Sequence, residues 1–254
     1  MLLTIDIGNT NITLGLFDGE HLRSTARLST VNGKTPDQYA VEIGQVLALH
    51  GEDISLIHHG IISSVVPSVG SAVSAAVELL CGVTPLMLGP GVKTGLNIRI
   101  DNPAQLGADL AAGAAGALGR YPLPCILIDM GTATTLTVLD KNGNFLGGSI
   151  AAGVRLTLQA LAQGTAALPM LHPTAPKAVI GRNTVDCMQS GIVYGTAAML
   201  DGLIDRMEEE LGEPATVVAT GGLAKEIIRH CKKDIVYNET LLLDGLKAIY
   251  EKNR

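Results

Sequence analysis

The sequence predicts an α/β protein built from two related halves, and three observations support this prediction. Two similar β-hairpin patterns occur in the chain, one at its N-terminus and one near its middle. Runs typical of strands alternate with runs typical of helices, which is the order found in layered α/β proteins. Hydrophobic residues make up 47% of the 254 residues, so the chain can bury a large apolar core.

The two hairpin patterns share one plan: a β-rich run, then Asp-x-Gly with small polar residues, then a second β-rich run that ends in an acidic turn. The Asp-x-Gly of the first copy is Asp6-Ile7-Gly8, and that of the second is Asp129-Met130-Gly131. Glycine suits a tight turn between two strands. Because the aspartates match in register, the sequence indicates an internal duplication.

A linker separates the two halves. The segment Gly119–Pro124 reads Gly-Arg-Tyr-Pro-Leu-Pro, a composition typical of a connection between structured parts. We therefore expect one domain over residues 1–118, which contains the first hairpin, and another over residues 119–254, which contains the second.

Helical patterns fill the stretches between the hairpins. Asn102 followed by Pro103 is typical of a helix start, because the asparagine side chain can cap the helix and proline suits its first position. The long stretch 184–211, which has apolar residues at spaced positions, is most simply a core helix. Helices are predicted over residues 36–49, 68–80, 103–118, 154–163, 184–211 and 223–231, and strands over residues 96–100 and 215–219.

Composition argues against several classes of protein. The formal net charge is −6 and the basic residues are scattered, which is unlike a nucleic-acid-binding surface. The apolar stretches are shorter than the ~18 residues of a membrane-spanning helix, and the first residues lack the features of a signal peptide. The four cysteines are far apart and form no Cys-x-x-Cys pair, so we expect reduced thiols, a cytoplasmic protein and no zinc site.

The duplicated hairpins point to phosphate chemistry. Backbone amides in a glycine turn can bind phosphate oxygens, and a nearby aspartate can hold a cation on the same oxygens. One Asp-x-Gly alone is most simply an ordinary turn, but two copies, each followed by hydroxyl side chains, favour a phosphate site. The glycine-rich segment 89–95 is predicted to be a plain loop, because Val92 precedes Lys93 where the P-loop motif requires glycine.

An ordered set of motifs along the whole chain resembles the type III pantothenate kinase family. Each motif is short, and their order gives the resemblance its specificity. The motifs are Asp6-Ile7-Gly8-Asn9-Thr10-Asn11, Gly107-Ala108-Asp109, Asp129-Met130-Gly131-Thr132-Ala133-Thr134-Thr135, Gly147-Gly148-Ser149-Ile150, Ile180-Gly181-Arg182-Asn183-Thr184, Ser190-Gly191-Ile192-Val193-Tyr194-Gly195 and Thr220-Gly221-Gly222-Leu223.

The resemblance implies a fold, an activity and partners. The fold is a pair of duplicated ribonuclease-H-like domains of the actin-like ATPase superfamily, with an ATP cleft between them. The activity is ATP-dependent phosphorylation of pantothenate to 4′-phosphopantothenate, the first step of coenzyme A biosynthesis. The family uses Mg-ATP and a monovalent cation, potassium or ammonium, and its members are homodimers. No nucleic acid and no membrane are expected among the partners.

The resemblance also implies roles for particular residues. Asp109 is the expected general base toward the pantothenate hydroxyl, Asp6 lies near the magnesium of Mg-ATP, and Asp129 coordinates the monovalent cation. The expected ATP-binding residues are Asp6, Ile7, Gly8, Asn9, Thr10, Asn11, Ile12, Thr13 and Thr132. The expected substrate-binding residues are Gly107, Ala108, Asp109, Leu110 and Thr184. The segment Thr220-Gly221-Gly222 is expected near the adenosine end of the nucleotide.

Elementary chemistry agrees with these roles. Phosphoryl transfer depends mostly on alignment and on neutralisation of phosphate charge. Because the hairpin turns contain no lysine or arginine, backbone amides and bound cations must supply the positive field. A carboxylate at Asp109 suits acceptance of a proton from a primary alcohol. Without the resemblance, Asp109 reads more simply as an exposed or capping aspartate of a helix.

Three positions differ from the usual pattern of the family. Leu110 stands where many members have arginine, Ile100-Asp101 stands where many have tyrosine, and Ala152 stands where many have proline. The first two differences leave carboxylate recognition open, with Arg99 or Arg155 as candidate replacements. The alternatives are therefore a kinase of another small hydroxy acid or sugar, or a non-catalytic regulatory homologue.

Overall fold

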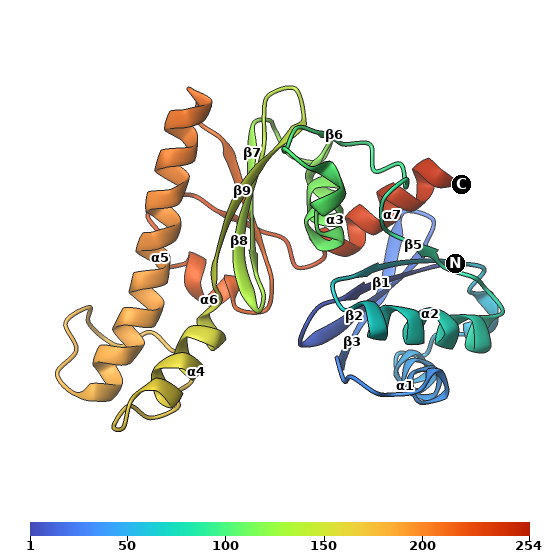
Figure 1. Ribbon diagram of the computed structural model, residues 1–254, viewed down its shortest axis with the longest axis horizontal. Coiled ribbons are helices and arrows are strands. Elements are labelled where there is room, and N and C mark those ends of the chain that lie inside the picture. The colour runs from blue at the N-terminus through green and yellow to red at the C-terminus, as the bar shows by residue number, and fades with distance from the viewer. The chain divides into compact units, whose positions relative to one another are not determined.

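The computed structural model describes residues 1–254, which divide into two compact units (Figure 1). Unit 1 comprises Met1–Leu96, Asp101–Leu118 and Thr240–Arg254, and unit 2 comprises Asn97–Ile100 and Gly119–Glu239. The change of unit after Leu118 coincides with the boundary expected from the linker.

The C-terminal residues differ from the expected division. They were expected in the second half, but helix α7 (Leu241–Asn253) belongs to unit 1. The reason is its apolar face: Leu243, Leu246 and Ile249 are at most 2% exposed and complete a core cluster of unit 1. Residues 240–254 therefore fold with the N-terminal residues.

Unit 1 is a five-stranded sheet covered by helices on both faces. Its strand order is β3-β2-β1-β4-β5, with β1 antiparallel to β2 and parallel to β4. Alternate side chains of β1 feed two apolar clusters: one contains α1 and α2, and the other contains α3 and α7. The elements are β1 (Leu2–Ile7), β2 (Asn11–Asp18), β3 (His21–Ser29), α1 (Pro36–Leu49), η1 (Ile54–Leu56), β4 (His59–Ser64), α2 (Pro67–Cys81), β5 (Leu86–Met87), η2 (Pro103–Gln105), α3 (Ala108–Ala117) and α7.

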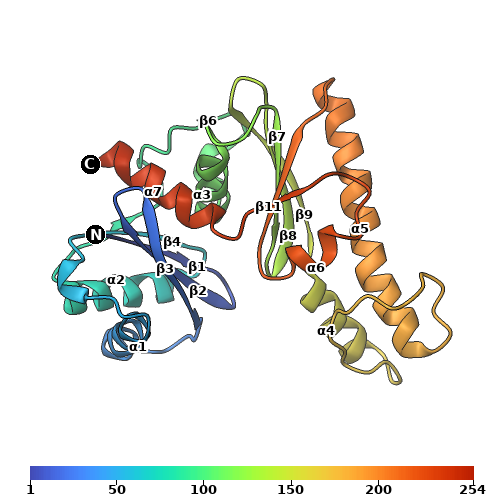
Figure 2. The ribbon, with the colours of Figure 1, turned by 180° about the vertical axis from the view of Figure 1, so that it is seen from behind.

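Local signals in the sequence set the ends of several helices. Helix α1 begins with a capping box, because the Thr35 hydroxyl accepts from the Gln38 amide and the Gln38 side chain accepts from the Thr35 amide. Helix α2 ends at Gly82, which adopts the left-handed conformation that favours glycine. These two helices lie side by side on one face of the sheet in both views (Figures 1 and 2).

The helix expected over residues 103–118 is interrupted. The Asn102 side chain accepts from the Ala104 amide as predicted, but the turn that it caps is the short helix η2. Gly107 then has a ψ of 139°, which is outside the helical region, and α3 begins at Ala108. The prediction of one continuous helix was wrong, and the break puts Asp109 in the first turn of α3.

Unit 2 is a six-stranded sheet in the order β11-β10-β7-β8-β9-β6. Its main apolar cluster lies between the sheet and the helices α4, α5 and α6, which cover one face (Figure 2). Helix α5 is capped by the Asn183 side chain, which accepts from the Asp186 amide, and it ends at the left-handed Gly212. The elements are β6 (Asn97–Ile98), β7 (Cys125–Met130), β8 (Ala133–Leu139), β9 (Asn144–Ala152), α4 (Val154–Gly164), α5 (Thr184–Leu211), β10 (Thr216–Thr220), α6 (Ala224–Ile228) and β11 (Val236–Tyr237).

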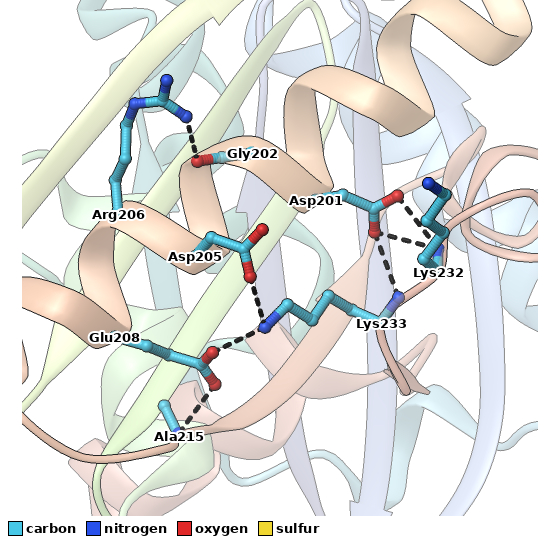
Figure 3. Close-up of polar contacts among 8 residues, drawn as sticks. All are labelled: Asp201, Gly202, Asp205, Arg206, Glu208, Ala215, Lys232 and Lys233. Atoms are coloured by element: carbon cyan, nitrogen blue, oxygen red, sulfur yellow. Dashed lines mark hydrogen bonds and ion pairs between the residues drawn. The ribbon is translucent and has the colours of Figure 1, made fainter.

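Hydrogen bonds and ion pairs connect the segment after α6 to helix α5 (Figure 3). The Asp201 carboxylate accepts from the backbone amides of Lys232 and Lys233 at 2.9–3.1 Å. The Lys233 ammonium contacts Asp205 at 2.6 Å and Glu208 at 2.7 Å. Burial alone would raise the pKa of Glu208, but the hydrogen bonds from Lys233 and the Ala215 amide, together with the charge of Lys233, outweigh burial and lower that pKa.

We expect Asp201→Ala to lower the free energy of unfolding by about 1–2 kcal/mol, because two backbone amides lose their acceptor. The matched control is Asp205→Ala. Its carboxylate is 56% exposed and contacts only the Lys233 ammonium, so its loss should change stability by less than about 1 kcal/mol. Urea denaturation of both variants measures the difference, and equal effects would contradict this interpretation.

No helix of the structure combines the length and the apolar character that crossing a membrane requires.

Candidate active site

The first hairpin turn joins β1 to β2 and is held from two sides. The Gly8 amide donates to the Asn11 carbonyl oxygen at 2.9 Å. Thr30, the residue after β3, adds two further bonds: its amide donates to the Thr10 carbonyl at 2.9 Å and its hydroxyl donates to the Gly8 carbonyl at 2.7 Å. Asn9, Thr10 and Asn11 remain exposed. The turn therefore presents an ordered, exposed backbone.

Two of the expected ATP-binding residues contribute no side chain to this turn. Ile7 and Ile12 are 0% exposed and belong to the apolar cluster with α1 and α2. Any contact that they make with a ligand would come from their backbone groups. Their side chains anchor the two ends of the turn in the core instead.

Asp6 lies near the end of β1, between two strands. Its register partners are Thr13 on β2 and Ser63 on β4. Because successive side chains of a strand alternate between faces, Asp6 shares a face with Leu2, which packs against α3 and α7. The Asp6 carboxylate is therefore half-buried on the α3 side of the unit 1 sheet.

Asp109 stands in the first turn of α3 and is also half-buried. Burial raises the pKa of its carboxyl group, and this effect outweighs the backbone amides of Leu110 and Asp109, which lower it. The Leu110 amide donates to Oδ1 at 2.8 Å. A carboxyl group in this setting takes up a proton more readily than an ordinary aspartate does.

Gly107 makes room for the Asp109 carboxylate. A Cβ atom at position 107 would lie 2.5 Å from Asp109 Oδ1 and 3.7 Å from its Cγ. This is closer than van der Waals contact allows, so any larger residue displaces the carboxylate. The φ of Gly107 is −58°, which any residue can adopt, so its backbone conformation does not require glycine. The nearby Asp109 carboxylate does.

If Asp109 is the general base of an enzyme, as expected from the sequence, Gly107→Ala should reduce kcat by about 10–100-fold, because a displacement of ~1 Å at a reacting group costs about this much. The displaced atoms end a flexible side chain, so the melting temperature should change little. Steady-state kinetics and thermal melting of the same preparation check both parts. An alanine variant with the kinetics of the wild type would show that the position of Asp109 does not matter.

Asp6 and Asp109 belong to the same face of unit 1. Ala108, next to Asp109, packs against the cluster that holds Leu2 of β1 and Ile61 of β4. Asp6 lies on that face of β1 as well. The structure therefore brings the first hairpin and the first turn of α3 to one side of one sheet.

The second hairpin joins β7 to β8 and repeats the plan of the first. Asp129 pairs in register with Thr135 on β8 and Thr220 on β10. The turn at Gly131 and Thr132 is exposed, and the Gly153 amide donates to the Thr132 carbonyl at 3.1 Å. The two aspartates thus occupy equivalent places in two sheets.

Two glycines enclose the second turn. A Cβ atom on Gly153 would collide with the Thr132 carbonyl oxygen, so no side chain fits there. Gly221 has a φ of +97°, and a Cβ on it would lie 2.7 Å from the backbone of Met130. The chain after β9, at Gly153, and the chain after β10, at Gly221, therefore both pass close to the turn, and each position requires glycine for that reason.

The remaining predicted residues lie in different places. Leu110 is half-buried beside Asp109 in α3. Thr184 is exposed in the first turn of α5, in unit 2, and no hydrogen bond joins it to the second hairpin. Arg99 and Arg155 also belong to unit 2, whereas Leu110 belongs to unit 1.

The donor set at Asp6 fits a magnesium ion that is shared with phosphates. The chain contains no group of three or more His, Cys, Asp or Glu side chains that could hold a metal ion. Magnesium in kinases is bound through one or two carboxylates, waters and the phosphates of the substrate. The Asp6 carboxylate supplies one such oxygen ligand, and its register partners on the two neighbouring strands are the hydroxyl residues Thr13 and Ser63.

Comparison with known proteins decides the family. The sequence profile described as type III pantothenate kinase matches residues 2–206. The chain is 41% identical to the type III pantothenate kinase of an Exiguobacterium species over 254 residues, which is 100% of each chain. It is 41% identical to that of Geobacter sulfurreducens, again over 100% of each chain, and 42% identical to that of Myxococcus xanthus over 100% of this chain and 99% of the relative.

The chain belongs to the type III pantothenate kinase family. Solved structures agree on the fold of this pantothenate kinase. A Campylobacter jejuni protein described as a Baf family transcriptional activator superposes with a TM-score of 0.64 at 17% identity, covering 99% of this chain and 98% of that one. Component A of (R)-2-hydroxyglutaryl-CoA dehydratase from Acidaminococcus fermentans gives 0.58 at 16% identity, covering 100% and 99%.

The predicted fold class of the pantothenate kinase is confirmed. The protein is an α/β protein of two units with one sheet in each, and its fold is that of the solved structures it superposes on. The identities to these solved structures are below 20%, so they bear on the fold alone.

Sequence reasoning missed several residues that shape the site. Thr30 and Ser63 carry no motif, and only the pairing of distant strands brings them beside the first hairpin. Gly153 follows the motif at 147–150 and could have been noticed as a glycine after a strand. Helix α7 could have been found from the apolar spacing of Leu243, Leu246 and Ile249.

Proposed function

We propose that Asp109 is the general base with which this pantothenate kinase phosphorylates its substrate, and that both hairpin turns bind the phosphates of ATP. The enzyme phosphorylates pantothenate at the expense of ATP in coenzyme A biosynthesis, as its family does. The observation that carries the assignment is the half-buried Asp109 carboxyl group, on the same face of unit 1 as Asp6.

The chain's own residues supply alignment and one proton acceptor. The amides of the exposed turn residues 9–11 and 131–132 donate to phosphate oxygens. The Asp109 carboxylate takes the proton of the pantothenate hydroxyl. At the same time the hydroxyl oxygen forms a bond to the γ-phosphorus of ATP, and the bond between that phosphorus and the ADP oxygen breaks. Magnesium, when bound, neutralises charge that develops on the phosphate oxygens, and Asp6 would hold it there.

Asp129 is proposed to hold a monovalent cation. Its register partners Thr135 and Thr220 carry hydroxyl oxygens. Hard cations prefer such oxygen donors. We expect Asp129→Asn to reduce the dependence of the rate on potassium or ammonium.

Thr184 and residues 107–110 are proposed to contact pantothenate.

The enzyme is proposed to act as a homodimer in the cytoplasm. Support comes from several large apolar side chains that unit 2 leaves exposed, because apolar side chains gathered on a surface mark places that bind another protein. They are Ile150, Leu156, Met170, Val179, Ile180 and Val185. The four cysteines are free, which agrees with a reducing compartment. Light scattering on the purified protein measures the oligomeric state.

Substrate identity is tested by incubating the purified enzyme with ATP and single acceptors. The panel contains pantothenate, other small hydroxy acids and simple sugars, each with and without potassium or ammonium. We expect ADP and phosphorylated acceptor to form in equal amounts with pantothenate alone, and only with the cation present. Turnover of a sugar in preference to pantothenate, or none with any acceptor, would contradict the proposal.

A further inference from the structure

Ser63 on β4 is an unusual residue of unit 1. Its side chain is 0% exposed, and its hydroxyl oxygen has no hydrogen-bond partner in the protein. The next residue, Ser64, points to the opposite face and is satisfied: its hydroxyl donates to the Val66 carbonyl at 3.0 Å and accepts from the Val66 amide at 3.1 Å. Two adjacent serines therefore differ completely in how their hydroxyls are used.

The position of Ser63 relates it to Asp6. The two residues are register partners on parallel strands, so their backbones lie about 4.8 Å apart and their side chains share a face. Ser63 also shares its face with Ile61, which packs against the helices α3 and α7. The Ser63 hydroxyl thus lies beside Asp6, on the face of the sheet that α3 covers.

Unit 2 repeats this arrangement. Asp129 has a threonine on its antiparallel neighbour, Thr135, and a buried threonine on its parallel neighbour, Thr220. Asp6 likewise has Thr13 on the antiparallel side and Ser63 on the parallel side. The duplication therefore extends beyond the hairpins to a hydroxyl residue on each side of the aspartate, one of which comes from a distant strand.

A buried hydroxyl without a partner destabilises a protein, because it has lost its bonds to water and gained none. Almost all buried polar groups in proteins have a partner, so an exception calls for an explanation. An alanine at position 63 would remove the unsatisfied oxygen and leave the strand pairing unchanged. Ser63 therefore brings no benefit to the stability of unit 1, and its use must lie elsewhere.

We propose that Ser63 is a positioning residue for Asp6. When Mg-ATP occupies the site, the Ser63 hydroxyl binds the Asp6 carboxylate. Rotation about χ1 of Ser63 brings its hydroxyl toward the neighbouring side chain on the same face. The hydroxyl donates to one carboxylate oxygen of Asp6 and leaves the other directed at the cation. This inference rests on the proposed role of Asp6 with magnesium.

The test compares Ser63→Ala with Ser64→Ala in the full-length chain. Thermal melting without ligand should show Ser63→Ala more stable than the wild type by roughly 2–4 °C, because an unsatisfied group is gone. Ser64→Ala should melt at a lower temperature, since it loses two hydrogen bonds. Calorimetric titration with ADP should show about tenfold weaker binding by Ser63→Ala in the presence of magnesium and unchanged binding in EDTA. Ser64→Ala should bind ADP as the wild type does under both conditions.

Three results would overturn the inference. One is a Ser63→Ala variant that binds ADP with magnesium as tightly as the wild type. Another is a variant whose binding is weakened equally with and without magnesium, because Ser63 would then act on the nucleotide itself. The third is a Ser63→Thr variant that keeps the hydroxyl, melts like the wild type and still loses the magnesium effect.

A double-mutant cycle separates this inference from the proposed function. If Asp6→Asn already abolishes the magnesium effect, Ser63→Ala should add nothing to it, which supports the coupling of the two residues. If Asp6→Asn leaves the magnesium effect intact, the role of Asp6 fails and the positioning role of Ser63 fails with it. If Asp6→Asn and Ser63→Ala weaken binding additively, Asp6 keeps its role and the inference about Ser63 alone is wrong.

Discussion

Asp109→Asn is expected to lower kcat by about 10²–10⁴-fold while ATP binds as tightly as before. The substitution keeps the shape of the side chain but removes the carboxylate that we propose accepts the proton, and general bases contribute a factor of this size. The turns that we propose bind the phosphates lie elsewhere in the chain, so the dissociation constant of ATP should not change. Single-turnover kinetics with pantothenate and nucleotide titration measure the two effects separately.

The same substitution should stabilise the protein at neutral pH. Burial raises the pKa of Asp109 in the folded state, so the fold favours the protonated acid. The stability due to this group is full at pH values below its unfolded pKa and is lost as the pH rises through its folded pKa. Asparagine does not ionise, so the melting temperature of Asp109→Asn should exceed that of the wild type increasingly as the pH rises through that range.

A kcat of the wild-type magnitude in Asp109→Asn would remove Asp109 from the chemistry. A variant that loses both activity and stability would show instead that the carboxylate holds the fold of α3. The two measurements together therefore distinguish a catalytic group from a structural one.

Gly116→Val is expected to destabilise unit 1 by about 3 kcal/mol or more. Helices α3 and α7 lie side by side in both views and meet at two glycines (Figures 1 and 2). A Cβ on Gly116 would collide with the Leu241 carbonyl oxygen, and one on Gly245 with the Ala112 carbonyl oxygen. Since both obstacles are backbone atoms, the helices must move apart, and overpacking of this kind is costly.

Gly113→Ala is the matched control for this prediction. Gly113 lies in the same helix and is also buried, but the nearest atom to a Cβ there is Leu242 Cδ1 at 3.9 Å, an ordinary contact. Alanine favours the helix over glycine, so this variant should be as stable as the wild type or up to about 1 kcal/mol more stable. Chemical denaturation of both variants checks the contrast, and equal destabilisation would contradict the close helix crossing.

The helix crossing also bears on catalysis. Helix α3 carries Asp109 in its first turn, and α7 is the element that packs most closely along it. A variant such as Gly116→Val that remains folded should therefore lose activity as well as stability. The match to the family profile ends at residue 206, so α7 lies outside the residues that the profile covers.

Local signals made part of the fold predictable. The two hairpins followed from alternating apolar residues around Asp-x-Gly, and the helix at residues 36–49 was predicted with the bounds that the structure has. The break before α3 was missed, because the Asn102 cap signals a helix start but not how long the helix continues. Gly107 was read as part of a substrate motif, whereas its backbone conformation ends the helical run.

Distant pairing explains what the sequence did not reveal about the site. The register of Asp6 with Ser63 depends on how β1 and β4 align across more than fifty residues of chain. The bonds from Thr30 to the first turn likewise depend on the position of β3 in the sheet. No local pattern marks either residue, whereas Asp6, Asp109 and Asp129 stand in short motifs that local reading can find.

Nucleotide titration of the wild type, Asp6→Asn and Asp129→Asn tests most directly whether the duplicated hairpins serve a single phosphoryl transfer. We expect one ATP to bind per chain, with either substitution weakening its binding about tenfold or more in the presence of magnesium and potassium. Binding of two nucleotides per chain would contradict this expectation. So would a substitution in either hairpin that left both ATP affinity and the rate of pantothenate phosphorylation unchanged.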